Sequence, residues 1–389
     1  MKVALLSHEG GGISSVTYGL AHSLSKKRVH TTVFTGSSEK PKVEHVNAYL
    51  EIIRLPFLGV PPRSVWFQLR NFRLLWKLPK DYTVLHGVSP YISVVYTLFK
   101  RKLKKPFIAS IHGTPRGALR AFIHSPISCW TYSDFASNVL ELPLNDLTIR
   151  KCMANSNHVV VSSFAALNEL RAYNNLNMNK VSVIYNGIDF DEIESIEIDH
   201  EKMDGRCDFS IIYAGRLLWM KGVMFVLKAF EILNRDFKSL ELKIFGKGPL
   251  EREIKRFIFN AGLRDNVHFG GHLPHKDLIA EVKKSDVVVL PSLYESQPMI
   301  ALEAMACKKP LVVFDLPYAR ELIVNEYNGL LAEVYNTKDL SDKIGLLLSD
   351  EKLRFKLGQN GYKYIKREHN WNILSEKYLE VYQNVAGTR

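Results

Sequence analysis

Residues 286–306 have the sequence DVVVLPSLYESQPMIALEAMA, which indicates a strand, a short loop and a helix in succession. Its apolar run, Asp286–Leu290, predicts a buried strand that the following Pro-Ser pair ends. Pro298 suits the first turn of a helix because it has no N–H to satisfy there, so a helix is predicted over Met299–Cys307. A continuous apolar strand that leads directly into a helix is typical of parallel sheets covered on both faces.

The same alternation continues along the chain. Helical patterns, for example over Ile13–Lys26 and Gly222–Asn234, separate further apolar runs. The predicted fold class is therefore α/β, with two Rossmann-like, doubly wound parallel-sheet domains that face a cleft. Further strands are predicted at Lys2–Ser7, Val29–Thr35, Tyr82–His86, Phe107–Ile111, His158–Val161, Val181–Ile184, Phe209–Ala214, Leu240–Phe245 and Leu311–Phe314.

The acidic stretch Asp189–Asp208 breaks this alternation, and we place the linker between the domains there. The sequence thus predicts an N-terminal domain over residues 1–190 and a second domain over residues 191–369. Residues 370–389 hold one more helical pattern after the second sheet is complete, and this helix is a candidate to pack back across the first domain.

The charge of the 389-residue chain is uneven. Of its formal net charge of +12, all lies in residues 1–150, which hold 20 basic and 8 acidic side chains, whereas residues 151–389 hold 32 of each. A 46% hydrophobic and 24% charged composition excludes disordered and fibrous classes. The run Tyr91–Phe99 is short of the ~18 residues that span a membrane, and Val3–Leu6 is expected to begin a strand rather than a signal peptide. The cysteines form no C-x-x-C pair, so reduced cytoplasmic thiols are expected at Cys129, Cys152, Cys207 and Cys307.

Three glycines, Gly10-Gly11-Gly12, follow the first predicted strand and precede a helix. Glycines at such a place let the backbone approach an anion, and the helix N-terminus supplies N–H donors. The spacing is not G-x-G-x-x-G, so it is weak support for a dinucleotide site. A tight strand-to-helix turn is the structural alternative.

Two cations, Arg216 and Lys221, lie in the segment Gly215-Arg216-x4-Lys221-Gly222 between a predicted strand and a predicted helix. Arginine as a planar fork and lysine as a point charge together suit a diphosphate. The alternative is a pair of solvated surface cations.

Two glutamates flank the start of the helix that opened this section. Glu303 lies about one turn inside, where its carboxylate can accept hydrogen bonds from vicinal hydroxyls, and Glu295 in the preceding loop can reach another part of the same ligand. The N–H groups of Met299 and Ile300 suit phosphate oxygens. The alternative is a pair of solvated glutamates near a helix start.

Taken in order, these motifs resemble the family-4 retaining glycosyltransferases of the GT-B fold. The resemblance rests on Glu295-x7-Glu303 followed by Ala-Met-Ala, on the Arg/Lys segment and on the N-terminal glycines. It also includes Asn186-Gly187-Ile188-Asp189 and Gly246-x-Gly248-Pro249, so it extends over nearly the whole chain. Many relatives have Gly-Phe-Gly after the first glutamate, where this chain has Ser296-Gln297-Pro298.

The resemblance implies a role for each matching residue. Arg216 and Lys221 would hold the donor diphosphate, Glu303 the ribose hydroxyls, and Glu295 the donor sugar. His112, after the strand Phe107–Ile111, would lie near the reacting sugar, although a histidine at a strand end is more often structural. Lining of the base is implied for Gly246, Gly248, Pro249 and Leu273, and approach to the phosphate or sugar for Gly11 and Gly12.

The reaction that the resemblance implies is transfer of a sugar from a UDP- or GDP-linked donor with retention of anomeric configuration, without a metal or another cofactor. Such a step asks for charge stabilisation and positioning rather than for a protein nucleophile. The sequence Asp189-Phe190-Asp191 spells the D-x-D that binds a metal in another glycosyltransferase fold, but solvated carboxylates are the favoured interpretation here. His268, His272 and His275 are interpreted as loop residues.

The basic half suggests an acceptor or membrane surface. Cations alternate with aromatic and aliphatic residues over a helical stretch, and such a pattern suits the interface of an anionic membrane. An amphipathic helix that packs on the core is the alternative. The side chains proposed for this surface are Arg63, Trp66, Arg70, Arg73, Trp76 and Lys77, with Lys80, Lys100-Arg101-Lys102 and Lys104-Lys105 nearby.

The leading hypothesis is therefore a metal-independent glycosyltransferase that acts on a lipid-linked or otherwise anionic glycan acceptor, in the cytoplasm and peripherally at the inner face of the membrane. A nucleotide-sugar epimerase of similar fold is the second enzymatic reading. A non-enzymatic nucleic-acid-binding protein is suggested by the +12 charge, but the neutral second half and the lack of a binding module speak against it.

Overall fold

The computed structural model describes residues 1–7, 11–37, 41–56, 63–92, 96, 105–125, 135–173, 177–198 and 207–387. The chain divides into two compact units, and neither is continuous in sequence. The first unit comprises residues 1–117, 141–187 and 369–389, and the second comprises residues 118–140 and 188–368.

The second unit is built on a six-stranded sheet with the order β11-β10-β9-β12-β13-β14, in which every pairing is parallel. Strands β12 and β13 are entirely apolar and buried because helices cover both faces, as the sequence predicts. The strands are β9 (Phe209–Ala214), β10 (Leu240–Phe245), β11 (Val267–Gly271), β12 (Val287–Leu290), β13 (Leu311–Phe314) and β14 (Leu330–Ala332).

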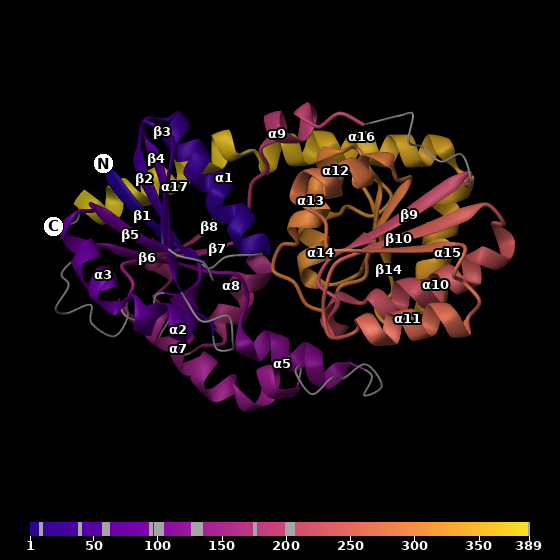
Figure 1. The fold of residues 1–389 in the computed structure, drawn as a ribbon, viewed down its shortest axis with the longest axis horizontal. Helices are drawn as coiled ribbons and strands as arrows, with labels where there is room; N and C mark the ends of the chain where they lie inside the picture. The colour runs from indigo at the N-terminus through magenta and orange to yellow at the C-terminus, as the bar shows by residue number, and fades with distance from the viewer. Residues whose placement is uncertain are drawn as a thin grey trace. The chain divides into compact units, whose positions relative to one another are not determined.

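Helices alternate with these strands. Figure 1 shows α10 and α11 on one side of the sheet and α12 and α13 on the other. The helices are α9 (Phe190–Ser195), α10 (Val223–Asp236), α11 (Glu251–Asn260), α12 (His275–Lys284), α13 (Met299–Ala306), α14 (Pro317–Leu322), α15 (Thr337–Ser349) and α16 (Glu351–Glu368).

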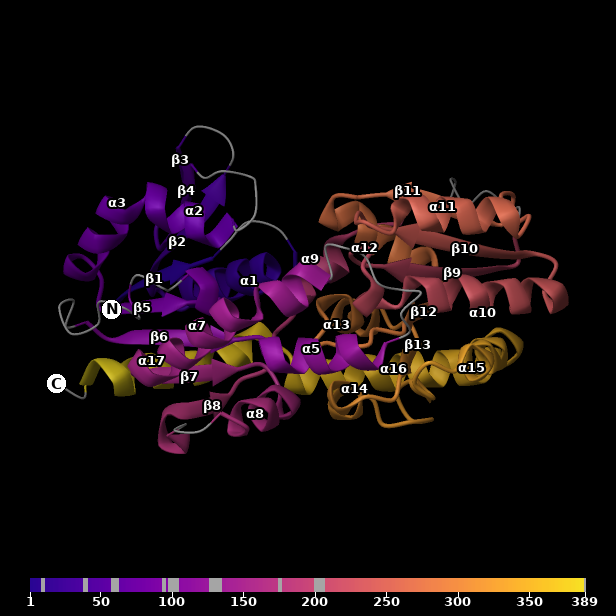
Figure 2. The same ribbon diagram turned by 90° about the horizontal axis from the view of Figure 1, so that it is seen from below.

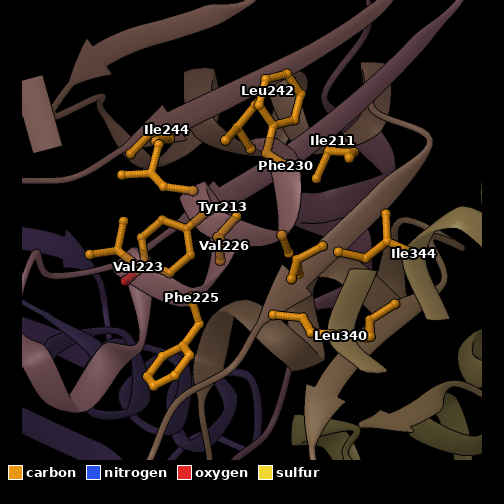
Figure 3. Close-up of a cluster of buried hydrophobic side chains, with 14 of the residues drawn as sticks. Ile211, Tyr213, Val223, Phe225, Val226, Phe230, Leu242, Ile244, Leu340 and Ile344 are labelled. Carbon is orange, nitrogen blue, oxygen red and sulfur yellow. The ribbon is translucent and has the colours of Figure 1, made fainter. Parts of the chain in front are cut away.

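The core of this unit lies between the sheet and its helices. Tyr213 and Leu242 from the sheet pack with Phe225 and Phe230 from α10 and with Leu340 from α15, all of them buried (Figure 3). Burial of apolar side chains on this scale is the main stabilising contribution to such a domain.

A segment from the first half of the sequence completes that core. Residues 118–140 belong to the second unit, and they include the end of α5 (Pro115–His124). Phe122 is 1% exposed and stacks edge-on against Trp219, with 5.2 Å between the ring centroids. The predicted first domain, continuous over residues 1–190, therefore differs from the structure, in which residues 118–140 belong to the second unit.

The first unit has an eight-stranded sheet with the order β3-β4-β2-β1-β5-β6-β7-β8, which Figure 2 shows from one edge to the other. All pairings are parallel except that of β3 with β4, which form an edge hairpin. The strands are β1 (Lys2–Leu6), β2 (His30–Ser37), β3 (Lys42–Asn47), β4 (Leu50–Pro56), β5 (Val84–Gly87), β6 (Phe107–Ile111), β7 (His158–Val161) and β8 (Val181–Val183).

Helices also cover this sheet on both faces. In Figure 1, α1 and α17 lie on one side of it and α2, α3 and α7 on the other. The helices are α1 (Gly12–Lys26), α2 (Arg63–Arg70), α3 (Phe72–Lys77), α7 (Leu142–Asn155), α8 (Phe164–Arg171) and α17 (Trp371–Gly387). Two doubly wound α/β units, the predicted fold class, are thus present.

The C-terminal helix α17 packs on α1 and β5 in the first unit. A Cβ atom added at Gly19 would lie 2.1 Å from the Trp371 ring, and one added at Gly187 would lie 2.5 Å from it. Ser23 in α1 donates a hydrogen bond to Ser375 at 2.8 Å. The glycine of the Asn186-Gly187 motif is therefore explained by close packing against Trp371.

Candidate functional site

The candidate site of the second unit is formed by loops that follow β9, β10 and β12. These three strands are parallel, and β9 lies between the other two. The carboxyl ends of parallel strands meet at one edge of a sheet, which is where ligands bind in open α/β folds. Arg216, Gly246 and Glu295 follow these strands and are brought to that edge.

Lys221 and Glu295 form an ion pair, although 74 residues separate them in sequence. Their side chains are 17% and 15% exposed, so water screens the pair only in part. The backbone between them is also joined, because the Leu293 N–H donates to the Met220 carbonyl at 2.7 Å. The structure thus brings together two of the residues that the sequence analysis selected.

Gly222, directly after Lys221, is required by this arrangement. Its φ of 70° lies in the left-handed region, and a Cβ atom there would lie 1.9 Å from the Pro291 carbonyl oxygen. The turn that carries Lys221 can therefore approach the loop leading to Glu295 only with glycine at this position.

Arg216 has an exposed side chain, while its loop is held by the loop after β10. The Gly215 N–H donates to the Phe245 carbonyl at 3.0 Å, and the Leu217 N–H donates to the Lys247 carbonyl at 3.0 Å. Cβ atoms added at Gly246 and Gly248 would collide with the carbonyls of Gly215 and Leu217, respectively. These two glycines therefore have a packing role whatever else they bind.

Glu303 is almost fully buried in α13, with 7% of its side chain exposed. His275 Nε2 lies 2.9 Å from Glu303 Oε1, and His275 Nδ1 lies 3.6 Å from Glu192 Oε1 in α9. Hydrogen bonds to Glu192 and to Glu303 raise the pKa of His275 to about 10. At neutral pH the ring is therefore an imidazolium that joins two carboxylates.

The interpretation of the three neighbouring histidines as loop residues is right for one of them. His275 is the first residue of α12, where Pro274 precedes it, and His268 lies in β11; His272 follows that strand. His275 is the site residue that the sequence analysis missed, and a proline immediately before a helical pattern was the available signal.

Met299 and Ile300 open α13, and Pro298 is in the N-cap position. Their N–H groups belong to the first turn of a helix, where the helix itself supplies no acceptor. Leu273 and Pro249 lie in loops after β11 and β10, respectively.

In the first unit, Gly11 precedes α1 with a φ of 73°, a conformation that favours glycine. The Ser14 N–H donates to the Gly11 carbonyl at 3.1 Å, so the tight turn is present, and both Gly11 and Gly12 are exposed. Gly10 lies outside the described residues. The observed turn is compatible with binding of an anion at Gly11 and Gly12.

His112 follows β6 and is half-buried. Burial lowers the pKa of His86 in β5 to about 3, and the nearby His112 lowers it further as the second-largest cause. His86 is fully buried between Tyr382 Oη at 2.7 Å and Ser110 Oγ at 2.8 Å. A neutral histidine therefore connects α17 to the sheet.

Acid is expected to destabilise the first unit through His86. The folded-state pKa is below the usual 6.5, so stability is lost as the pH falls from 6.5 towards 3, where only the unfolded chain binds the proton. Between pH 7 and pH 4 this loss amounts to about 3 kcal/mol. Urea unfolding of the native chain and of the His86→Gln variant measures it: the variant should lose less stability over this interval, and an exposed-histidine control, His124→Gln, should lose as much as the native chain.

The Asp189-Phe190-Asp191 sequence has a structural explanation at its first residue. Asp189 caps α9, because its Oδ1 accepts a hydrogen bond from the Glu192 N–H at 3.2 Å. Within the described ranges, no group of three or more His, Cys, Asp or Glu side chains is placed to hold a metal ion.

The basic stretch forms the short helices α2 and α3. Phe67 and Leu75 are buried against the unit, whereas Leu69 is 62% exposed and Phe72 and Leu74 are also exposed. Trp76 stacks on Phe72, with 5.6 Å between ring centroids. The cations Arg70, Arg73, Lys77 and Lys80 are exposed; the side chains of Arg63 and Trp66, and residues 100–104, lie outside the described part.

These helices pack on the core and also present apolar and basic side chains to solvent. The membrane surface stays a prediction. Among the described residues, no helix combines the length and apolar character that crossing a membrane requires.

Each half of the chain matches a known protein family. The model for "Glycosyltransferase Family 4" matches residues 10–192, and the model for "Glycosyl transferases group 1" matches residues 199–364. An uncharacterised glycosyltransferase of Methanocaldococcus jannaschii is 26% identical over 400 residues, 98% of each chain. The N,N'-diacetylbacillosaminyl-diphospho-undecaprenol alpha-1,3-N-acetylgalactosaminyltransferase of Campylobacter jejuni is 35% identical over 175 residues, 45% of this chain and 44% of that one.

Solved structures share the fold over the whole chain. Sucrose-phosphate synthase from Thermosynechococcus elongatus superposes with a TM-score of 0.80 at 19% identity, covering 100% of both chains. Anabaena HepE, solved in complex with UDP-glucose, superposes with a TM-score of 0.74 at 15% identity, covering 99% of this chain and 100% of that one.

Proposed function

The chain belongs to the family-4 glycosyltransferases with the GT-B fold, and from this we propose that it transfers a sugar from a nucleoside-diphosphate sugar with retention of anomeric configuration. The observation that carries the proposal is the Lys221–Glu295 ion pair, which joins the segments that follow β9 and β12. Arg216 lies on the same segment after β9, and the buried Glu303 lies in α13, the helix that follows β12.

In the proposed donor complex, Arg216 and Lys221 bind the diphosphate and Glu303 accepts hydrogen bonds from the ribose hydroxyls. Glu295 is paired with Lys221 in the structure. The incoming diphosphate replaces this carboxylate as the partner of Lys221, and Glu295 then accepts from hydroxyls of the donor sugar. The ion pair thus keeps both side chains in place before the donor arrives.

The same two cations stabilise the transition state. As the bond between the anomeric carbon and the diphosphate oxygen breaks, negative charge grows on the leaving group, and fixed cations beside it lower the barrier. A leaving phosphate oxygen takes the proton of the acceptor hydroxyl, so no protein nucleophile is required. We propose that Arg216 and Lys221 do this without a metal ion or a cofactor.

The relatives support a class of donor nucleotide and a class of acceptor for this chain. Anabaena HepE was solved with UDP-glucose, which supports UDP as the first donor to test. The Campylobacter relative is named for a diphospho-undecaprenol acceptor, which supports a lipid-linked, anionic acceptor for this chain too.

The test is product analysis with a panel of UDP- and GDP-sugars and lipid-diphosphate acceptors. The proposal predicts a glycosylated acceptor whose new bond has the anomeric configuration of the donor, at a rate unchanged by EDTA. A changed nucleotide sugar without transfer would instead indicate an epimerase. RNA binding without transfer would indicate a nucleic-acid-binding protein, and loss of activity in EDTA would contradict the metal-independent mechanism.

We further propose that α2 and α3 hold the enzyme on the anionic inner face of a membrane, where a lipid-linked acceptor lies. Each basic residue near such a surface contributes about 1 kcal/mol, so neutralising Arg70, Arg73 and Lys77 to Gln should weaken binding about 100-fold. Flotation with anionic vesicles measures this binding, which should also weaken with salt.

A matched control keeps the change in net charge but moves it to the second unit, with Gln at the exposed positions Lys228, Arg235 and Lys238. This control should float like the native chain. Equal flotation of both triple variants, or binding insensitive to salt, would show that α2 and α3 are not the membrane surface.

A further inference from the structure

One histidine connects three helices around the carboxylate proposed to bind ribose. His275 opens α12, Glu303 lies in α13 and Glu192 lies in α9. The distances are 2.9 Å from His275 Nε2 to Glu303 Oε1 and 3.6 Å from His275 Nδ1 to Glu192 Oε1. The imidazole is 41% exposed, whereas the Glu303 side chain is 7% exposed.

Burial makes this contact important for Glu303. An ionised carboxylate removed from water is costly unless hydrogen bonds replace the lost hydration. Within the part of the chain that the structure describes, His275 is the one cationic side chain within ion-pair distance of Glu303. Burial raises the pKa of the nearby Cys307 to about 12, so this thiol is neutral. The hydrogen bond from His275 therefore replaces part of the lost hydration of Glu303 and fixes its orientation.

The Glu303 carboxylate also has hydrogen-bonding capacity that His275 does not use. A carboxylate offers about four lone-pair positions on its two oxygens, and His275 uses one on Oε1. Both oxygens thus retain acceptor capacity for a vicinal diol. Glu192 restrains the opposite side of the imidazole, so the ring is held from both nitrogens.

We propose that His275 is a positioning residue for the donor nucleotide: it holds the Glu303 carboxylate in the orientation that receives the ribose hydroxyls. This rests on the proposed function of Glu303 and goes beyond it by assigning ribose affinity to a residue that does not touch the reacting atoms. Neighbouring carboxylates raise the pKa of His275 to about 10, which provides a donor at both ring nitrogens at neutral pH.

The experiment is calorimetric titration with UDP and with 2′-deoxy-UDP, or with the GDP pair if GDP is the nucleotide that binds. The ratio of the two dissociation constants measures what the ribose hydroxyl contributes. In the native chain we expect a ratio of about 10 or more, as for loss of one hydrogen bond to a charged acceptor. In His275→Ala, UDP should bind about 10-fold more weakly and the ratio should fall below about 3.

Two further variants separate positioning from general damage. His275→Gln retains an N–H donor of similar reach and should restore most of the ratio. Lys276→Ala removes the exposed neighbour on the same helix and should match the native chain. In turnover, His275→Ala should raise the KM for the donor and leave kcat within about threefold, since it acts on binding common to ground and transition states.

Failure of the inference is distinguishable from failure of the function. Suppose that the ratio of the dissociation constants for 2′-deoxy-UDP and UDP falls in Glu303→Ala but stays native in His275→Ala. The proposed ribose site then stands, and the role of His275 is wrong. If Glu303→Ala keeps the full ratio, the assignment of Glu303 itself is wrong.

Discussion

Replacing Glu303 by Ala should weaken binding of the nucleoside diphosphate about 100-fold, because two hydrogen bonds from ribose to a charged acceptor are lost, each contributing about 1.5 kcal/mol. The effect is large because the carboxylate is buried and oriented by His275 before the ligand arrives. Binding energy is then not used to order the side chain.

The measurement is the dissociation constant for UDP or GDP by calorimetry. Since Ala leaves a void at a buried position of α13, the thermal midpoint is recorded as well, and Glu303→Gln serves as the variant of equal volume. Gln keeps one acceptor oxygen and should lie between the native chain and Ala. Native affinity in both variants would mean that ribose binds elsewhere.

Replacing Lys221 by Ala should lower kcat by about 10²–10³-fold, the usual loss for one group that stabilises charge in the transition state. Two effects act together. The leaving diphosphate loses a cation, and Glu295, which is 15% exposed, loses the partner that neutralises it and now repels the phosphates.

Kinetics with saturating donor separate these effects. The double variant Lys221→Ala, Glu295→Ala removes the repulsion but does not restore the cation. It should therefore bind the donor better than Lys221→Ala does, and its kcat should remain low. Lys228→Ala, which removes an exposed cation of the following helix, is the matched control and should keep native kcat. A kcat for Lys221→Ala within threefold of native would remove Lys221 from the mechanism.

The parts of the fold that sequence predicted are those in which burial alone determines structure. Phe107–Ile111 and Leu311–Phe314 have the predicted bounds, because apolar runs of this length are stable only in a covered sheet. Phe209–Ala214 and Leu240–Phe245 also have the predicted bounds, although each contains polar residues. The edge strand β3 was missed because its side chains are mostly exposed and give no apolar pattern. Strands β14 and β11 were also missed, because β14 has only three residues and β11 ends in two glycines.

The candidate site divides in the same way. Residue types and spacing selected Lys221, Glu295 and Glu303, but their partners depend on which strands are neighbours. Lys221 meets Glu295 because β9 pairs with β12, and His275 meets Glu303 because α12 contacts α13. Such long-range pairings are set by sheet order, which local sequence patterns do not encode.

The most direct test of the central claim is a crystal structure of the chain with a UDP-sugar that it accepts. The proposal predicts the diphosphate within hydrogen-bonding distance of Arg216 and Lys221, the ribose hydroxyls on Glu303, and the Lys221–Glu295 pair opened. A nucleotide bound away from these residues, or a metal ion joining the diphosphate to Asp189 and Asp191, would contradict it.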